Sequence, residues 1–305
     1  MRIFKNRGDI YFSKNNKEKS AEQRFLIAAL ALIVVFTFIF VVFVGVKNDF
    51  SAKEFFKPDN IETTHAFNDE QQLPSVSGKS NFISVVSEDE NLLFVSLVQV
   101  DLDSVSYKVS NLKAQTVCDG KPLSDIFKDG GVQNVQNAVE SLLDIKFDYY
   151  IHLEKAKYNE FFNEMGRVNY PVLSEIKFRD NESPVPYSAR FKAGEQKLDG
   201  SQIINLTRYY LEEENNTEAA NELMLVCLSQ QINPENLKKS DELFSLFMEL
   251  SETNITIRDF SVAGDGITVL SDERSGVKVY SAAAEYDADS LSSESLQKIK
   301  GYFVK

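Results

Sequence analysis

The chain has 305 residues, of which 33 are Lys or Arg and 46 are Asp or Glu, and its formal net charge is −13. An acidic chain repels polyanions, so nucleic acid is not expected as a partner. The two histidines, His65 and His152, lie far apart and do not have the spacing of metal ligands, so a structural or surface role is expected for both.

Residues 1–24 contain seven basic side chains against three acidic ones. Because basic residues stay on the cytoplasmic side of a membrane span, this segment is predicted to be a cytoplasmic tail. The same bias places everything after Lys47 outside the cytoplasm. A short basic tail of this kind serves as a topology signal and is attracted to anionic lipid.

Residues 25–46 read FLIAALALIVVFTFIFVVFVGV, and Thr37 is their only polar side chain. A helix of that length extends about 33 Å, enough to cross a bilayer core of about 30 Å. The segment continues directly into the charged residues 47–49 and shows no small-residue cleavage site. It therefore predicts an uncleaved transmembrane helix.

Residues 47–80 are predicted to be a flexible tether, because they are rich in polar residues and contain Pro58, Pro74 and Gly78. Residues 81–305 are long enough for one large domain with its own core. Without the charges of the first 24 positions, the chain retains 26 basic and 43 acidic residues, a net charge of −17. A polymer such as teichoic acid could approach this domain only through a local basic patch or with bound cations.

The first half of the domain alternates strands and helices. Runs of β-branched and aromatic residues predict strands at 82–86, 92–100 and 106–112. Residues 129–131 look like a turn, and apolar residues at helical spacing then predict a helix at 132–143. A strand at 145–153 and a helix at 154–165, ended by Gly166, follow. This order predicts an α/β domain with a central β-sheet flanked by helices.

The second half is less regular. Residues 170–196 hold three of the chain's seven prolines and are predicted to form an extended loop region. Helices are expected at 201–210, at 217–232 and, capped by Ser240, at 241–250. Short apolar runs predict strands at 255–257, 267–270 and 277–280, and a final helix is expected at 293–303.

Few residues suggest chemistry. The sequence has no Gly-rich phosphate loop, nucleophile elbow or EF-hand. Cys118 and Cys227 could form a disulfide, but Cys227 lies in the apolar run 223–228, which favours a buried free thiol. The acidic run 212–214 is interpreted as solvated.

Three stretches, however, occur in an informative order: residues 125–131 (DIFKDGG), residues 138–150 (AVESLLDIKFDYY), and Gly194 followed by residues 198–200 (LDG). In this order they resemble the LytR-CpsA-Psr family of bacterial cell-envelope proteins. The resemblance implies a single-pass protein of the bacterial cell membrane with an extracytoplasmic α/β domain. It also implies transfer of polyprenyl-pyrophosphate-linked glycopolymers to peptidoglycan, and thus a role in cell wall biogenesis.

The chain departs from the family pattern at most site positions. Ala114 and Gln115 stand where the family has an Arg and an Asp. Leu93 stands where the family has an Asp whose carboxylate helps to hold a divalent cation. After the LDG motif the family usually has two arginines spaced two apart. The first is present here as Arg208, and Tyr210 replaces the second. The next helix of the family opens with an Arg-Gln pair, but here it opens with residues 218–221 (EAAN). Residues 163–168 match the family's Asp-Ala-Leu-Gly-Gly-Val segment but lack its Asp and one Gly.

Two functions therefore remain open. The first is a catalytically impaired family member, a pseudoenzyme that binds a polyprenyl-phosphate lipid, a wall polymer, or an active relative or other envelope protein. The second is a divergent phosphotransferase with a rebuilt site. A generic single-span sensor or adhesion domain would require the family resemblance to fail.

The candidate residues follow from the same reasoning. Arg208 is the candidate phosphate-binding residue, against a structural ion pair with a nearby carboxylate. Lys113 and Arg167 are weaker candidates, and a rebuilt site could also use Lys121 and Lys128. No catalytic residue or metal ligand is assigned. No cofactor is expected, and Mg²⁺ would be needed only if the protein is an active transferase.

Overall fold

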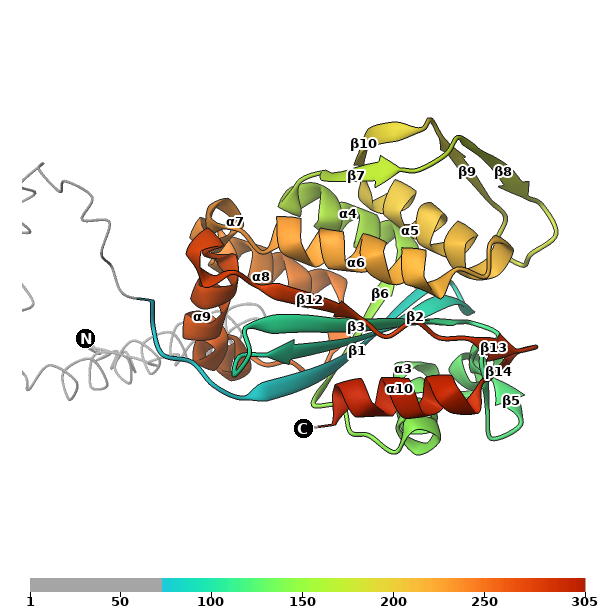
Figure 1. Ribbon diagram of the computed structural model, residues 1–305, viewed down its shortest axis with the longest axis horizontal. Coiled ribbons are helices and arrows are strands. Elements are labelled where there is room, and N and C mark those ends of the chain that lie inside the picture. The colour runs from blue at the N-terminus through green and yellow to red at the C-terminus, as the bar shows by residue number, and fades with distance from the viewer. Residues whose placement is uncertain (1–72, 305) are drawn as a thin grey trace, which may run out of the picture. The chain divides into compact units, whose positions relative to one another are not determined.

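The computed structural model describes residues 73–304 (Figure 1). The expected cytoplasmic tail, the transmembrane helix at 25–46 and most of the tether lie outside the described residues. Within the described part of the chain, none of the helices has the length and apolar character needed to cross a bilayer.

The core of the domain is a mixed six-stranded sheet with the strand order β11-β6-β1-β2-β3-β12. Three antiparallel neighbours, β1 (Lys79–Glu88), β2 (Asn91–Asp101) and β3 (Ser106–Lys113), confirm the three strands predicted first. β6 (Tyr149–Glu154) runs parallel to β1, and β12 (Lys278–Ser281) runs parallel to β3. The short β11 (Glu252–Thr253) pairs with β6 at the other edge. The predicted α/β class is confirmed.

Helices cover both faces of this sheet (Figure 1). α3 (Leu123–Leu143) and α10 (Ser293–Phe303) pack on one face, where Cys118 is buried. α4 (Lys155–Met165), α5 (Gly200–Arg208) and α6 (Thr217–Gln231) form the other layer, where Cys227 is buried. The two cysteines are free and lie in clusters on opposite sides of the sheet, which agrees with the expected free thiol.

The predicted turn at 129–131 is a bend inside α3. The helix begins at Leu123, because Leu123 and Phe127 already face the core. Gly131 then adopts φ 67° and ψ −158°, a conformation that is essentially restricted to glycine. The glycine pair therefore bends α3. The sequence predicted that the helix would begin only after this pair.

The strand predicted at 145–153 is shorter than expected. Ile145 and Phe147 are buried as its alternation requires, but β6 begins only at Tyr149. The reason is that the Phe147 N–H donates to the Glu140 carboxylate at 3.0 Å and not to a neighbouring strand. The apolar alternation thus continues through a connection that a helix side chain holds in place.

The prediction of an extended loop region at 170–196 is wrong. The segment forms two antiparallel pairs, β7 (Val168–Val172) with β10 (Gly194–Leu198) and β8 (Ile176–Asp180) with β9 (Tyr187–Phe191). Pro171 is tolerated because β7 pairs on one side only and does not need every N–H. Alternating burial along β7 and β9 fits these strands to the helix layer beneath them.

The strands expected at 255–257 and 267–270 are also wrong, because both fall in or beside helix α9 (Ile257–Ser271). Thr256 and Asp259 form a capping box that starts this helix. The sequence also predicted that Ser240 caps the helix before α9, which is α8 (Ser240–Leu250). Ser240 instead lies inside α8, and the cap position is Lys239.

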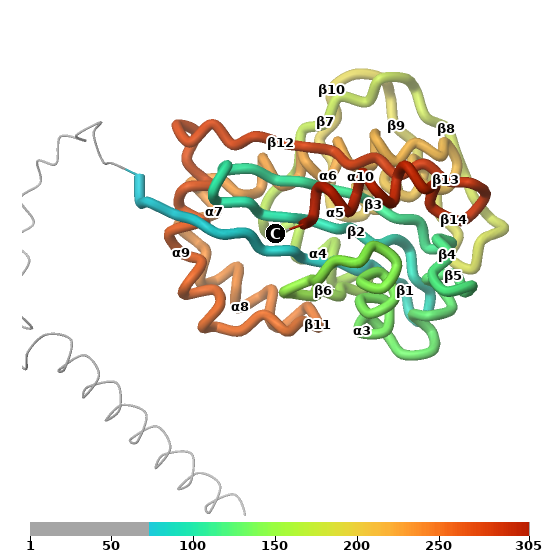
Figure 2. The backbone as a smooth tube through the Cα atoms, turned by 60° about the horizontal axis from the view of Figure 1, so that its bottom comes forward, coloured from blue at the N-terminus to red at the C-terminus, as the bar shows by residue number. Residues whose placement is uncertain are grey.

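The remaining elements are η1 (Tyr209–Glu213), α7 (Pro234–Lys238), η2 (Glu273–Ser275), β4 (Val117–Cys118), β5 (Lys121–Pro122), β13 (Tyr286–Asp287) and β14 (Ser290–Leu291). Figure 2 shows β13 and β14 near β4 and β5.

Candidate functional site

Some of the candidate positions, Lys113, Arg208 and Tyr210 among them, lie around one end of the sheet. There the start of β2 pairs with the end of β3, with Phe94 opposite Lys113. The π-helix η1 continues from α5 and contacts β3. The LDG motif starts α5: Asp199 caps it, and a Cβ on Gly200 would come within 2.6 Å of the Asn159 Cα in α4. The motif thus fixes the start of α5 against α4, and Arg208 lies at the other end of the same helix, next to η1.

Arg208 is buried, with 3% of its surface exposed, and all of its guanidinium nitrogens have partners. Its Nε and Nη2 donate to the two carboxylate oxygens of Glu212 at 3.0 and 3.1 Å. Its Nη1 donates to the carbonyl oxygen of Val185 at 2.9 Å, and Nη2 lies 3.5 Å from the Ser183 hydroxyl. The guanidinium also lies 3.9 Å from the centroid of the Tyr187 ring. Arg208 thus ties the β8–β9 connection to the end of α5.

Two carboxylates surround this guanidinium. Burial raises the pKa of Glu212, and the hydrogen bonds from Arg208 offset part of that increase. Burial also acts to raise the pKa of Asp180, but hydrogen bonds from Ser183 and Glu182 and the charge of Arg208 lower it overall. The acidic run at 212–214 is therefore not simply solvated, because its first member is the counter-ion of Arg208.

Three further site positions, Leu93, Ala114 and Tyr210, carry uncharged side chains that belong to the core. Leu93, Ala114 and Tyr210 are 2%, 3% and 6% exposed. None of the three offers a charged group to a phosphate or a cation. Within residues 73–304, no group of three or more His, Cys, Asp or Glu side chains is arranged to hold a metal ion.

Lys113 lies at the end of β3 under a tyrosine from the C-terminal segment. Its Nζ is 4.6 Å from the centroid of the Tyr286 ring, and its backbone N–H donates to the Tyr286 hydroxyl at 3.2 Å. Burial lowers the pKa of Lys113, while the charges of Asp289 and Glu212 act in the opposite direction. The Lys113 ammonium is thus covered by an aromatic ring and near two carboxylates.

The remaining basic candidates do not join Arg208. Arg167 is exposed beside Gly166, whose carbonyl accepts a hydrogen bond from Gln231 at the end of α6. Arg208 lies before the start of α6, whereas Arg167 lies near its end. Because α6 has 15 residues, its two ends are about 22 Å apart. Lys121 pairs with Asp129 at 3.2 Å, and Lys128 is exposed on α3, on the opposite face of the sheet. The basic cluster expected of a rebuilt site does not assemble.

The start of α6, where the resemblance expects an Arg-Gln pair, has a structural role. The Asn221 side-chain oxygen accepts hydrogen bonds from the Asn111 backbone at 2.7 Å and from its side chain at 3.0 Å. Its Nδ2 donates to the Ser281 hydroxyl at 3.0 Å. Asn221 thus joins α6 to β3 and β12.

A cavity of about 360 Å³ lies beside Tyr210, between the β7–β8 connection and α6. The hydroxyls of Tyr170 and Tyr210 share a hydrogen bond at its wall. Its charged lining residues are Glu214 and Glu222. Acidic side chains at this position oppose the entry of a pyrophosphate.

A Ser-His-Glu chain of contacts, which was not predicted from the sequence, crosses three strands. The Ser87 hydroxyl is 2.9 Å from His152 Nε2, and His152 Nδ1 is 3.1 Å from the Glu252 carboxylate. The residue types match those of a hydrolase triad, but Ser87 is fully buried, with 0% of its surface exposed. The chain ties β1, β6 and β11 together, which is the structural role expected for His152.

Comparisons with known proteins agree with this fold. The LytR_cpsA_psr family matches residues 77–300. The polyisoprenyl-teichoic acid–peptidoglycan teichoic acid transferase TagV of Bacillus subtilis is 23% identical over 188 residues, 60% of this chain and 46% of TagV. The alignment thus spans about half the length of that relative.

Solved structures show the same fold at low identity. The crystal structure of B. subtilis TagV superposes with a TM-score of 0.59 at 17% identity, covering 75% of this chain and 96% of the chain in that crystal. A Eubacterium siraeum protein described as a transcription regulator gives 0.63 at 17% identity, covering 79% and 97%. The structure of TagT bound to LI-WTA gives 0.53 at 16% identity, covering 77% and 92%. Because the family match spans most of the described domain, this chain belongs to the LytR-CpsA-Psr family of cell-envelope proteins.

Proposed function

We propose that this protein is a catalytically impaired LytR-CpsA-Psr protein that binds a polyprenyl-linked glycopolymer, or the wall polymer itself, without transferring it. The name of its relative TagV points to teichoic acid as the class of polymer. Binding requires surface complementarity, whereas transfer also requires the charge that develops on the leaving phosphate to be neutralised.

The observation that carries this proposal is the pairing of Arg208 with Glu212. A guanidinium that stabilises a leaving pyrophosphate must present free N–H donors to it. Here the donors are taken by a carboxylate, a carbonyl and a hydroxyl, and the residue is almost fully buried. Leu93, Ala114 and Tyr210 supply no replacement.

A transfer assay tests the proposal. The full chain, purified in detergent, is incubated with Mg²⁺, a lipid-linked teichoic acid donor and peptidoglycan, beside TagV as the active control. We expect no transfer above background, because loss of even one preorganised donor typically reduces the rate by about 10²- to 10³-fold. Transfer near the TagV rate that disappears in Arg208→Ala, in protein that circular dichroism shows to be folded, would instead establish a rebuilt-site phosphotransferase.

We also propose that residues 25–46 anchor the protein in the bacterial cell membrane, with residues 1–24 in the cytoplasm and the domain outside. The support is the uncharged length of the segment and the basic bias before it. Protease added to cells whose wall has been opened is expected to remove a C-terminal epitope and to spare an N-terminal one. Protection of the C-terminal epitope would overturn the topology.

A further inference from the structure

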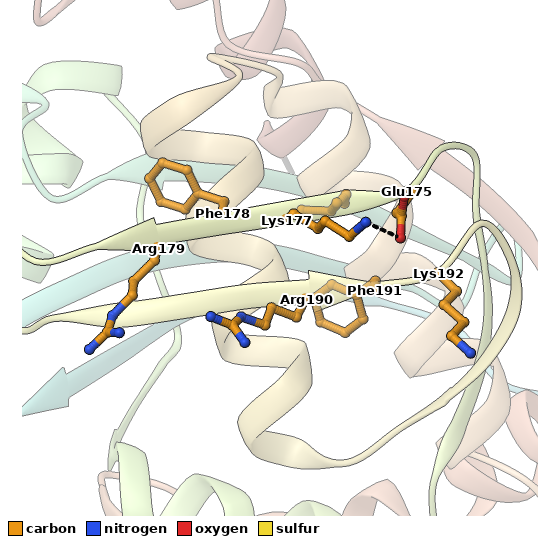
Figure 3. Close-up of a pocket in the computed structure, with 8 residues that line it drawn as sticks. Glu175, Lys177, Phe178, Arg179, Arg190, Phe191 and Lys192 are labelled. Atoms are coloured by element: carbon orange, nitrogen blue, oxygen red, sulfur yellow. Dashed lines mark ion pairs between the residues drawn. The ribbon is translucent and has the colours of Figure 1, made fainter.

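The outer face of the β8–β9 hairpin is strongly basic. It forms a hollow of about 510 Å³ whose lining includes Lys177, Arg179, Arg190 and Lys192, with Glu175 as the only acidic residue. Figure 3 shows these side chains spread along the two strands, with the Lys177–Glu175 ion pair, 2.8 Å long, at one end. Four cations thus gather on one small surface of a strongly acidic domain.

The strand register explains how they share a face. Lys177 lies directly opposite Arg190, and Arg179 lies opposite Ser188. Side chains alternate along a strand, so these residues point outward while Ile176, Ala189 and Phe191 are buried. Like charges directly opposite each other destabilise a hairpin. The arrangement therefore has a cost that packing does not explain.

Most of these cations lack acidic partners. Among the described residues, no ion pair includes Arg179, Arg190 or Lys192. By contrast, Arg208, which lies close to the hairpin, is fully neutralised by Glu212. The free positive charge of this part of the molecule therefore lies on the hairpin surface.

The surface also continues towards the candidate site. Arg179 and Arg190 line a second hollow of about 260 Å³ together with Asp180 and Tyr187. The Tyr187 ring is the one that stacks on Arg208. A chain lying across the hairpin would therefore extend towards the end of α5.

We propose that the basic face of the β8–β9 hairpin binds the phosphodiester backbone of an anionic wall polymer. Successive outward residues on a strand are about 6.6–6.8 Å apart, which gives a row of cations for the repeated phosphates of an extended chain. Arginine presents a planar fork of donors that binds phosphate oxygens in pairs. A concave surface fits a single polymer chain better than the plane of an anionic bilayer.

This inference rests on the proposed function, because it names the surface that takes the polymer, but it requires neither transfer nor its absence. Repulsion from the rest of the acidic domain weakens the binding of a single small anion. A polymer can engage several cations at once and is therefore the ligand that this surface favours.

Binding of lipid-free poly(glycerol phosphate) to the full chain in detergent tests the proposal. Arg179→Gln with Arg190→Gln is expected to weaken binding by roughly tenfold or more, since two charge-assisted contacts are lost. Both side chains are exposed, so the variant should fold, and its circular dichroism and melting temperature check this. Lys157→Gln with Lys298→Gln is the control, because it removes two exposed cations elsewhere.

Binding that is unchanged in the hairpin variant, or that falls equally in the control variant, would overturn the proposal. So would absence of polymer binding combined with binding to vesicles of anionic lipid that the hairpin variant loses, because the surface would then recognise a membrane. Binding of the lipid-linked donor that is equal in wild type and hairpin variant would leave the proposed function standing and remove the hairpin from it. Transfer activity would remove the impaired-enzyme proposal and leave the hairpin result intact.

Discussion

At the scale of single residues, Arg208 shows that a side chain retained from a family pattern can keep its position and change its role. Each nitrogen of its buried guanidinium already donates to the β8–β9 connection or to one acidic side chain, so the group is not presented to a ligand. A buried pair of this kind is costly to form, because both charges lose water. It is even more costly to break, because the remaining charge then has no partner.

This asymmetry gives a prediction. Arg208→Ala should destabilise the domain by about 3–5 kcal/mol, because Glu212 is left buried without its counter-ion. Replacing both partners, as Arg208→Met with Glu212→Leu, should recover most of that loss. Urea unfolding of the two variants measures the difference.

The exposed Arg179 provides the control, since Arg179→Ala should change the free energy of unfolding by less than about 0.5 kcal/mol. Equal destabilisation in the single and double Arg208 variants would contradict the ion-pair argument. It would show that the other contacts of Arg208, such as its guanidinium over the Tyr187 ring, carry the stability.

At the scale of elements, two glycines in helices have opposite roles. Gly131 bends α3 with a conformation that other residues avoid. Gly264 lies within α9, where its φ is not in the left-handed region and an added Cβ would meet no atom within 4 Å. The first is required by the path of the chain, whereas the second only weakens its helix.

Alanine substitutions separate the two cases. Gly131→Ala should destabilise the domain by about 1–3 kcal/mol, because the bend forces a side chain into a disfavoured conformation. Gly264→Ala should stabilise it by about 0.5–1 kcal/mol through helix propensity. Thermal unfolding of both variants checks the opposite signs, and a shift in the same direction would refute this account of α3 or α9.

At the scale of the whole molecule, charge decides how stability depends on pH. Asp101 interacts with Lys79 and Lys108 at 3.6 and 3.5 Å. Burial acts to raise its pKa, but hydrogen bonds from Ser104 and the two lysines lower it overall. Burial likewise opposes the lowered pKa of Glu140, which is set by Lys146, the Phe147 N–H and Gln136.

Because both pKa values are lower in the folded state, their stabilising effect is fully present above the ordinary values of 3.8 and 4.5. It is lost as the pH falls through the lowered values. The melting temperature should therefore fall on acidification below about pH 4.5, and Asp101→Asn with Glu140→Gln should flatten that fall. A variant with an unchanged acid slope would show that other carboxylates, such as Asp272, control it.

Those parts of the fold in which local pattern and tertiary packing agree could be predicted from the amino-acid sequence. The β1–β3 meander, the helices α4, α6 and α10, and the family membership all followed from periodicity and from short motifs. The LDG motif could be recognised because a helix cap and a close helix contact each require particular residue types. The apolar replacements at Leu93, Ala114 and Tyr210 were equally visible.

The other elements and contacts depend on how distant parts of the chain pack together. The prolines of residues 170–196 suggested a loop, and β7–β10 form because the helix layer offers a surface on which alternate residues can be buried. The β-branched residues at 267–270 suggested a strand, but burial of one helical face and a capping box made them helical. Likewise, the partner of Arg208 and the clustering of cations on the β8–β9 hairpin depend on which side chains meet. Propensity and periodicity act over a few residues, whereas burial and ion pairing depend on contacts between distant segments, which exist only after the chain has folded.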